Sequence, residues 1–246
     1  MSIENDRRAL DEEFERLRES GRVLRDPGGI GYDVESLPDF FDAVAHLWDA
    51  KFAVGSHSLH RAVAAQFPVT REPLAILDVG CGTGLELAHI FERVPNAEIT
   101  AMDQAPRMLA ELGTKYAERM GRITLREASC VEWPTGLVDF DYVVSVLCVH
   151  HFPTDTKVGI YRHFREALKP GGAYVEGDQM TDGPAGAEDH GEYERAIAKL
   201  PGGRIGEWNY DVTLNYETNR QLLREAGFAR VERRWRADGE AVLVAR

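Results

Sequence analysis

A glycine-rich turn between an apolar run and a helical pattern restricts this chain to a small set of folds. The run covers residues 75–79, and glycines follow it at the alternate positions 80, 82 and 84. Because glycine has no side chain, backbone N–H groups of such a turn approach a ligand closely, and the next helix packs on the strand. The turn therefore predicts a nucleotide-type site at the end of a strand.

The spacing of these glycines excludes two common nucleotide motifs. A dinucleotide fingerprint, G-x-G-x-x-G, needs glycine where this chain has Leu85 or Leu87, and a P-loop needs a Gly-Lys-Ser/Thr run that is missing here. What remains is the pattern D-x-G-x-G-x-G, which begins at Asp78. The turn therefore fits neither phosphate-binding motif.

Short apolar runs alternate with helical patterns through the rest of the chain. Strands are predicted at 74–79, 97–103, 122–127, 139–145, 172–177, 228–236 and 240–245, and helices at 84–93, 106–119, 155–168 and 217–226. This alternation predicts a doubly wound α/β fold with a mostly parallel, seven-stranded sheet. The short connection at 237–240 predicts a C-terminal antiparallel hairpin.

The N-terminal part has a different pattern. Helices are expected there over residues 4–19, 39–51 and 56–67. We therefore predict an N-terminal helical cap or lid, residues 1–70, on an α/β domain, residues 71–246, and expect a homodimer to pair through the N-terminal helices.

Composition disfavours several classes of protein. Of the 246 residues 43% are hydrophobic, but they form no run long enough to span a membrane. The net charge of −12 opposes binding to nucleic acid. The first residues lack a secretory pattern, and the three cysteines form no Cys-x-x-Cys pair. We expect a cytoplasmic protein with reduced thiols and no membrane partner.

Further motifs follow the glycine turn in a particular order. Asp103 ends the second predicted strand, an apolar run leads to His150 and His151, and a Pro-Gly-Gly turn spans 170–172. With the D-x-G-x-G-x-G turn, this order resembles that of the class I S-adenosylmethionine-dependent methyltransferases over about residues 74–246. The resemblance implies a Rossmann-like fold with S-adenosylmethionine as cofactor and S-adenosylhomocysteine as product.

The resemblance also assigns residues to the cofactor. Asp103 would bind the ribose hydroxyls, and the uncharged Gln104 leaves no basic residue there for a 2′-phosphate. Ser129 stands where most relatives place an aspartate for the adenine. The full cofactor set implied is Asp78, Gly80, Cys81, Gly82, Thr83, Gly84, Asp103, Gln104, Met108, Ser129, Cys130, Val131, Val146 and Leu147.

The acceptor side is less defined by sequence. The sulfonium of the cofactor makes its methyl group electrophilic, so the protein mainly aligns a nucleophile. Candidates for a base are His150, His151 and Asp178, with pocket lining as the alternative for the histidines. Candidates for the substrate pocket are Tyr32, Trp48, Phe52 and Glu176. No metal site is expected, because His57 and His60 have no third ligand at a suitable spacing.

Together these features predict methyl transfer to a small-molecule acceptor through an oxygen, nitrogen, sulfur or carbon nucleophile. Two alternatives stay open. The first is an enzyme of the same fold related to tRNA modification, including synthesis of a modified S-adenosylmethionine. The second is a non-catalytic sensor that binds S-adenosylmethionine or S-adenosylhomocysteine.

Overall fold

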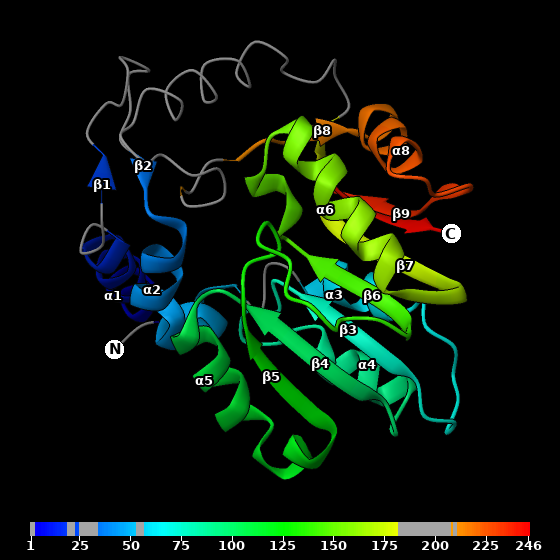
Figure 1. The fold of residues 1–246 in the computed structure, drawn as a ribbon. Helices are drawn as coiled ribbons and strands as arrows, with labels where there is room; N and C mark the ends of the chain where they lie inside the picture. Colours follow the sequence, from blue (N-terminus) through cyan, green and yellow to red (C-terminus); the bar gives the residue numbers. More distant parts are fainter. Residues whose placement is uncertain (1–2, 19–22, 25–33, 53–56, 182–207, 209–210) are drawn as a thin grey trace.

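A computed structural model describes residues 3–18, 23–24, 34–52, 57–181, 208 and 211–246. Its centre is one eight-stranded sheet (Figure 1), in which seven strands follow the order β5-β4-β3-β6-β7-β10-β9 and β8 pairs with β7. The strands are β3 (Ala75–Val79), β4 (Glu98–Asp103), β5 (Ile123–Glu127), β6 (Phe140–Val146), β7 (Leu168–Thr181), β8 (Leu214–Asn215), β9 (Val231–Ala237) and β10 (Glu240–Ala245).

The order of the strands reverses beside β3. From β3 the chain runs outward through β4 and β5, and then returns to place β6 against the other edge of β3. All of these pairs are parallel, as is the pair of β6 and β7. In sheets of this kind, ligands bind beyond the carboxyl ends of the strands at the reversal.

The C-terminal hairpin has the predicted antiparallel form. β10 pairs antiparallel with both β7 and β9. Asp238 and Gly239 form the turn with φ of +48° and +80°, and two positive φ values are typical of a two-residue hairpin turn whose twist matches that of the strands. The predicted fold class is thus confirmed, and β8 is an addition to the seven predicted strands.

Helices cover both faces of the sheet (Figure 1). One face carries α3 (His57–Ala64), α4 (Leu87–Arg93) and α5 (Pro106–Lys115), and the other carries α6 (Thr154–Ala167) and α8 (Tyr216–Glu225). The helix predicted from residue 84 begins at Leu87, because Gly84 has φ of +70° and cannot be part of a right-handed helix. Two separate hydrophobic cores result, one on each face.

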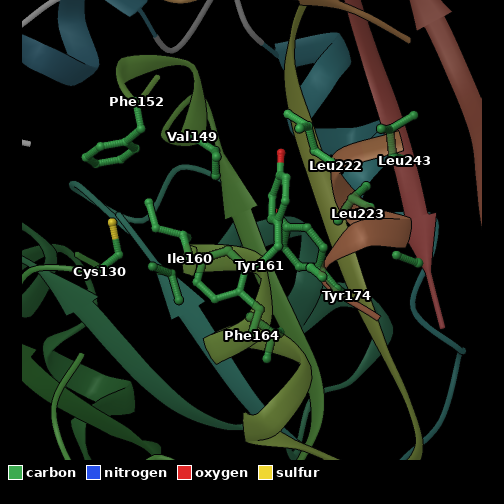
Figure 2. Close-up of a cluster of buried hydrophobic side chains, with 14 of the residues drawn as sticks. Cys130, Val149, Phe152, Ile160, Tyr161, Phe164, Tyr174, Leu222, Leu223 and Leu243 are labelled. Carbon is green, nitrogen blue, oxygen red and sulfur yellow. The ribbon is translucent and has the colours of Figure 1, made fainter. Parts of the chain in front are cut away.

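Aromatic side chains fill the core under α6. Tyr161 and Phe164 of α6 face Tyr174 of β7, at ring-centroid distances of 5.8 and 5.0 Å (Figure 2). Figure 2 shows Leu222 and Leu243 on one side of these rings. These large rings have almost no exposure to solvent, so β7 has a tightly packed support where it reaches the ligand-binding edge.

The N-terminal helices lie partly over that edge. α1 (Ile3–Arg18) packs on α2 (Leu37–Phe52) through Phe14, whose ring meets Phe40 at 6.0 Å. Ala45 of α2 packs against Met108 of α5, and Figure 1 shows α2 near the end of β4. The strands β1 (Val23–Leu24) and β2 (Val34–Glu35) pair antiparallel beside these helices. By contrast, α3 contacts β7 and β10, so this part of the predicted cap packs on the sheet.

None of the helices within the described ranges has the length and apolar character needed to cross a membrane.

Candidate functional site

A cavity of about 400 Å³ opens at the carboxyl ends of the parallel strands. Most of the predicted cofactor residues line it: Gly80, Cys81, Gly82, Thr83, Asp103, Gln104, Met108, Ser129, Cys130, Val146 and Leu147. Trp48, Phe52, His150 and His151 line it as well. The cavity therefore joins the glycine turn, the carboxyl ends of the parallel strands and the α2 helix.

Five predicted residues lie away from this lining. Asp78, Gly84 and Val131 are neighbours of lining residues, while Glu176 and Asp178 lie on β7. Tyr32, another predicted pocket residue, falls outside the described residues.

The glycine turn has the close backbone approach that its sequence predicts. Gly80 has φ of +67°, and a Cβ atom there would lie only 2.3 Å from Sγ of Cys148. Gly82 has φ of +49°, but a Cβ atom there would meet no described atom within 4 Å. Gly80 is thus required by the protein's own packing, whereas the space beside Gly82 is open toward the cavity.

Asp103 connects the end of β4 to the glycine turn. Its Oδ2 accepts a hydrogen bond from the N–H of Gly82 at 2.8 Å, and its Oδ1 accepts one from the N–H of Ala105 at 2.9 Å. Burial raises the pKa of the Asp103 carboxyl, although these N–H donors act in the opposite direction. Asp103 therefore holds the turn in place and borders the cavity beside Gln104.

Two buried acids lie close together behind the turn. Both carboxyl oxygens of Asp78 are buried and have no hydrogen-bond partner among the residues that the structure describes. Burial, together with the charge of Glu86, raises the pKa of Asp78 well above its ordinary value. Nε2 of His60 lies 3.8 Å from Oε2 of Glu86. Two acids this close together and this deeply buried favour a cationic group nearby.

The α2 helix is attached to the site through Asp49. Oγ1 of Thr83, in the glycine turn, donates to Oδ1 of Asp49 at 2.5 Å, and Nζ of Lys115 in α5 lies 2.5 Å from Oδ2. Thirty-four residues separate Asp49 from Thr83, so their pairing has no local pattern. These two contacts keep α2 beside the cavity.

Four aromatic residues of α2, Phe40, Phe41, Trp48 and Phe52, form one wall of the cavity. The rings of Phe41 and Trp48 are 5.2 Å apart, and those of Trp48 and Phe52 are 4.3 Å apart. Phe41 also meets the ring of His151 edge-on at 5.7 Å. This wall suits a flat, apolar molecule that lies next to the histidines.

His150 is held in a defined orientation by Asp178. Its Nδ1 lies 2.5 Å from Oδ1 of Asp178, and its backbone N–H donates to Oδ2 at 3.1 Å. Burial lowers the pKa of His150, but the Asp178 carboxylate outweighs this and raises it above the ordinary value. For His151, burial and the charge of His150 lower the pKa to about 4. The pKa of His150 therefore lies above that of His151, so His150 keeps its proton at a higher pH than His151 does.

Asp211 is the acidic residue that the sequence did not indicate. Its Oδ1 lies 3.2 Å from Nδ1 of His151 and 3.6 Å from Nε2 of His150, and it lines the cavity. The next residue, Val212, donates its N–H to the carbonyl of His150 at 2.5 Å and accepts from Nζ of Lys157 at 2.9 Å. No spacing rule connects Asp211 to a histidine pair sixty residues earlier.

Glu176 was predicted as a pocket residue, but it is buried in β7 and does not line the cavity. Its Oε2 accepts a hydrogen bond from the hydroxyl of Tyr174 at 3.0 Å, and Tyr174 in turn pairs with Ser145 at 2.7 Å. Burial and the charge of Asp178 raise the pKa of Glu176 to about 7. Glu176 thus belongs to a polar network behind the cavity wall.

Comparison with known proteins matches this architecture to one kind of enzyme. A methyltransferase domain matches residues 76–172. Demethylmenaquinone methyltransferase of Chlorobaculum parvum is 29% identical over 215 residues, which cover 80% of this chain and 86% of that protein.

Two malonyl-[acyl-carrier protein] O-methyltransferases also match. The protein from Geobacter sulfurreducens is 30% identical over 205 residues, covering 81% of this chain and 72% of its own length. The protein from Xylella fastidiosa is 30% identical over 146 residues, which cover 57% of this chain. That match covers 47% of the Xylella fastidiosa protein, about half of its length.

A solved structure, that of the DhpI–SAH complex, has the same fold. It superposes with a TM-score of 0.64 at 20% identity, covering 84% of this chain and 93% of that chain. The predicted resemblance, the Rossmann-like fold and the methyl donor are confirmed by the matches together. Because the Geobacter relative is 30% identical and the match covers 72% of it, this chain belongs to the class I S-adenosylmethionine-dependent methyltransferases.

Proposed function

We propose that this methyltransferase acts on a small, flat, largely apolar acceptor held between the α2 helix and the His150–His151 segment. One observation carries the proposal. A single cavity contains the glycine turn and Asp103, and also the aromatic wall and the two histidines. Donor and acceptor bound in such a cavity would lie next to each other, and proximity is the main contribution that a methyltransferase must supply.

The residues at the glycine end fit S-adenosylmethionine. The open space beside Gly82 leaves room for a ligand against the backbone. The carboxyl of Asp78, buried behind the turn, would attract the cationic amino group of the methionine part, and Asp103 suits the ribose hydroxyls. Gln104 has no positive charge, so it would not attract the phosphate group of a phosphorylated ribose. We propose these residues as the cofactor site.

Bound S-adenosylmethionine supplies a methyl group that its sulfonium already makes electrophilic. The protein's task is to orient the acceptor and to keep water away from it. Phe41 and Trp48 would stack on the acceptor, while His150, oriented by Asp178, faces its reacting end. Asp178 thus acts by positioning His150, since it does not itself line the cavity.

The lining of the cavity supports a small, flat acceptor, and the net charge of the chain disfavours a nucleic-acid acceptor. Aromatic rings dominate the wall beside the histidines, which suits a ring-bearing molecule with a hydroxyl group. Relatives are named for demethylmenaquinone and for a malonyl group on acyl-carrier protein. A net charge of −12 disfavours a tRNA acceptor.

We expect Phe41→Ala to raise KM for the acceptor by roughly ten-fold, because it removes a stacking ring at the centre of the proposed pocket. Release of S-adenosylhomocysteine would be measured against a panel of small phenols and quinols. The affinity for S-adenosylhomocysteine should change less than KM, because Phe41 contacts His151 at the acceptor end, although it also packs near Met108.

Leu47→Ala is the matched control, since Leu47 lies on the same helix but packs toward α1. Leu47→Ala should change neither the KM for the acceptor nor the affinity for S-adenosylhomocysteine. Equal effects of both substitutions would contradict the pocket assignment. Cofactor binding without turnover on any acceptor would support the sensor instead, and turnover on RNA alone would support the tRNA-related alternative.

We also propose a cytoplasmic setting, a lid formed by α1 and α2, and a homodimer that pairs through these helices. The three cysteines are unpaired thiols, which supports a reducing compartment. The contacts of Asp49 with Thr83 and Lys115 support the lid, because they connect α2 to the cofactor turn.

A further inference from the structure

Three potential metal ligands meet at the acceptor end of the cavity. They belong to His150, His151 and Asp211, each of which has one ligand atom within 4.8 Å of those of the other two. The carboxylate oxygen is 3.2 Å from the His151 nitrogen and 3.6 Å from the His150 nitrogen. A cation with bonds of about 2.0–2.2 Å holds neighbouring ligands roughly 3.0–3.6 Å apart, so small side-chain movements bring these atoms to that spacing.

The orientation of His150 is that of a metal-binding imidazole. Its Nδ1 lies 2.5 Å from Asp178, and donation of the Nδ1 proton leaves the lone pair of Nε2 directed toward Asp211. Histidines that bind metals almost always donate their other ring nitrogen to a carboxylate or carbonyl in this way. Asp178 is itself fixed, because the N–H groups of His150 and Gln179 also donate to it.

The two segments that supply the ligands are held together by the protein. Val212, directly after Asp211, hydrogen-bonds to the carbonyl of His150, and Nζ of the buried Lys157 donates to the carbonyl of Val212. His150 and His151 are buried, while the side chain of Asp211 keeps 57% exposure. All three line the cavity, so a cation here would have open coordination positions on the side of the acceptor.

We propose that His150, His151 and Asp211 bind a divalent transition-metal cation of the zinc or ferrous type. Two imidazole nitrogens and one carboxylate oxygen suit such ions, whereas magnesium and calcium prefer all-oxygen sites. This proposal differs from the sequence-based expectation of no metal. If the proposed function is also correct, the cation would bind the acceptor hydroxyl and lower its pKa, as metals do for bound water.

The metal site is tested without acceptor or S-adenosylmethionine, so its failure is distinct from failure of the proposed function. Tag-free full-length protein, treated with EDTA and dialysed, is titrated with Co²⁺ and Zn²⁺ alone at pH 7.5. We expect one equivalent to bind, with visible Co²⁺ absorption and without the thiolate bands that binding at the cysteines would give. Asp211→Asn should weaken binding at least ten-fold, and Asp178→Asn by about 10- to 100-fold.

The matched control is His89→Gln. His89 belongs to another histidine pair, with its ring 4.9 Å from that of His57 and its Nδ1 3.6 Å from Glu92, and it should have no effect on metal affinity. Because the Asp211 side chain is mostly exposed, its variant should fold, and a thermal melt verifies this. Absence of binding, equal affinity in Asp211→Asn, a loss in His89→Gln or thiolate absorption would each overturn the proposal.

Discussion

Asp103→Ala is expected to weaken S-adenosylhomocysteine binding by about 30- to 1000-fold, equivalent to ~2–4 kcal/mol. The substitution removes the carboxylate proposed to hold the ribose hydroxyls. It also removes the acceptor for the N–H of Gly82, which holds the glycine turn against the end of β4. Isothermal titration calorimetry of the wild type and the variant measures the loss directly.

Two further variants separate the ribose contact from general damage. Asp103→Asn keeps the size and one acceptor oxygen, so its loss should be smaller than that of alanine. Glu98→Gln changes an acid at the start of the same strand, where it pairs with Arg122 at the surface, and should leave the affinity unchanged. An unaltered affinity in Asp103→Ala would refute the ribose role.

Gly82→Ala should lower affinity for S-adenosylhomocysteine by about 10- to 100-fold, because the added methyl group would occupy space proposed for the ligand. In the protein itself that space is open, since a Cβ atom there meets no described atom within 4 Å. The cost to folding should be limited to the positive φ of +49°, about 1–2 kcal/mol. Calorimetric titration and thermal unfolding report the two effects separately.

Gly171→Ala is the matched control for the backbone cost. Gly171 also has a positive φ, +85°, and open space around it, but it lies near the start of β7 and does not line the cavity. Gly171→Ala should lower the free energy of unfolding by a similar amount and should leave the affinity for S-adenosylhomocysteine unchanged. If Gly82→Ala bound S-adenosylhomocysteine as tightly as Gly171→Ala does, the ligand would not lie against the turn as proposed.

Local sequence patterns were enough to predict the fold and the glycine end of the cavity. The apolar run, the alternate glycines and Asp103 are each readable from a few neighbouring residues, and the parallel pairing of β3 with β4 brings them together. The hairpin was readable for the same reason, because Asp238 and Gly239 tolerate the positive φ that its turn requires.

The acceptor end depends on contacts between distant segments, which no local pattern encodes. Asp211 reaches the histidines only because Val212 is held to the backbone of His150. Asp49 reaches Thr83 only through the packing of α2 on α5. Asp211 is a common type of residue, and only the folded chain distinguishes it from an ordinary surface acid.

The two acids of β7 show how strand geometry decides which side chain reaches a site. Glu176 and Asp178 are two residues apart, so they point to the same face of the strand, with Asp178 nearly 7 Å nearer its carboxyl end. That step takes Asp178 to His150 and leaves Glu176 beside Tyr174. Asp178, predicted as a base candidate together with the histidines, therefore contacts His150, whereas Glu176, predicted as a pocket residue, does not line the cavity.

The cavity between the glycine turn and Asp103 is expected to bind S-adenosylmethionine rather than a dinucleotide. Calorimetric titration of the unmodified protein with S-adenosylmethionine, S-adenosylhomocysteine and NADH tests it most directly. The geometry predicts that the first two bind with one molecule per chain and that NADH does not bind. Tight binding of NADH, or no binding of S-adenosylhomocysteine, would contradict the account.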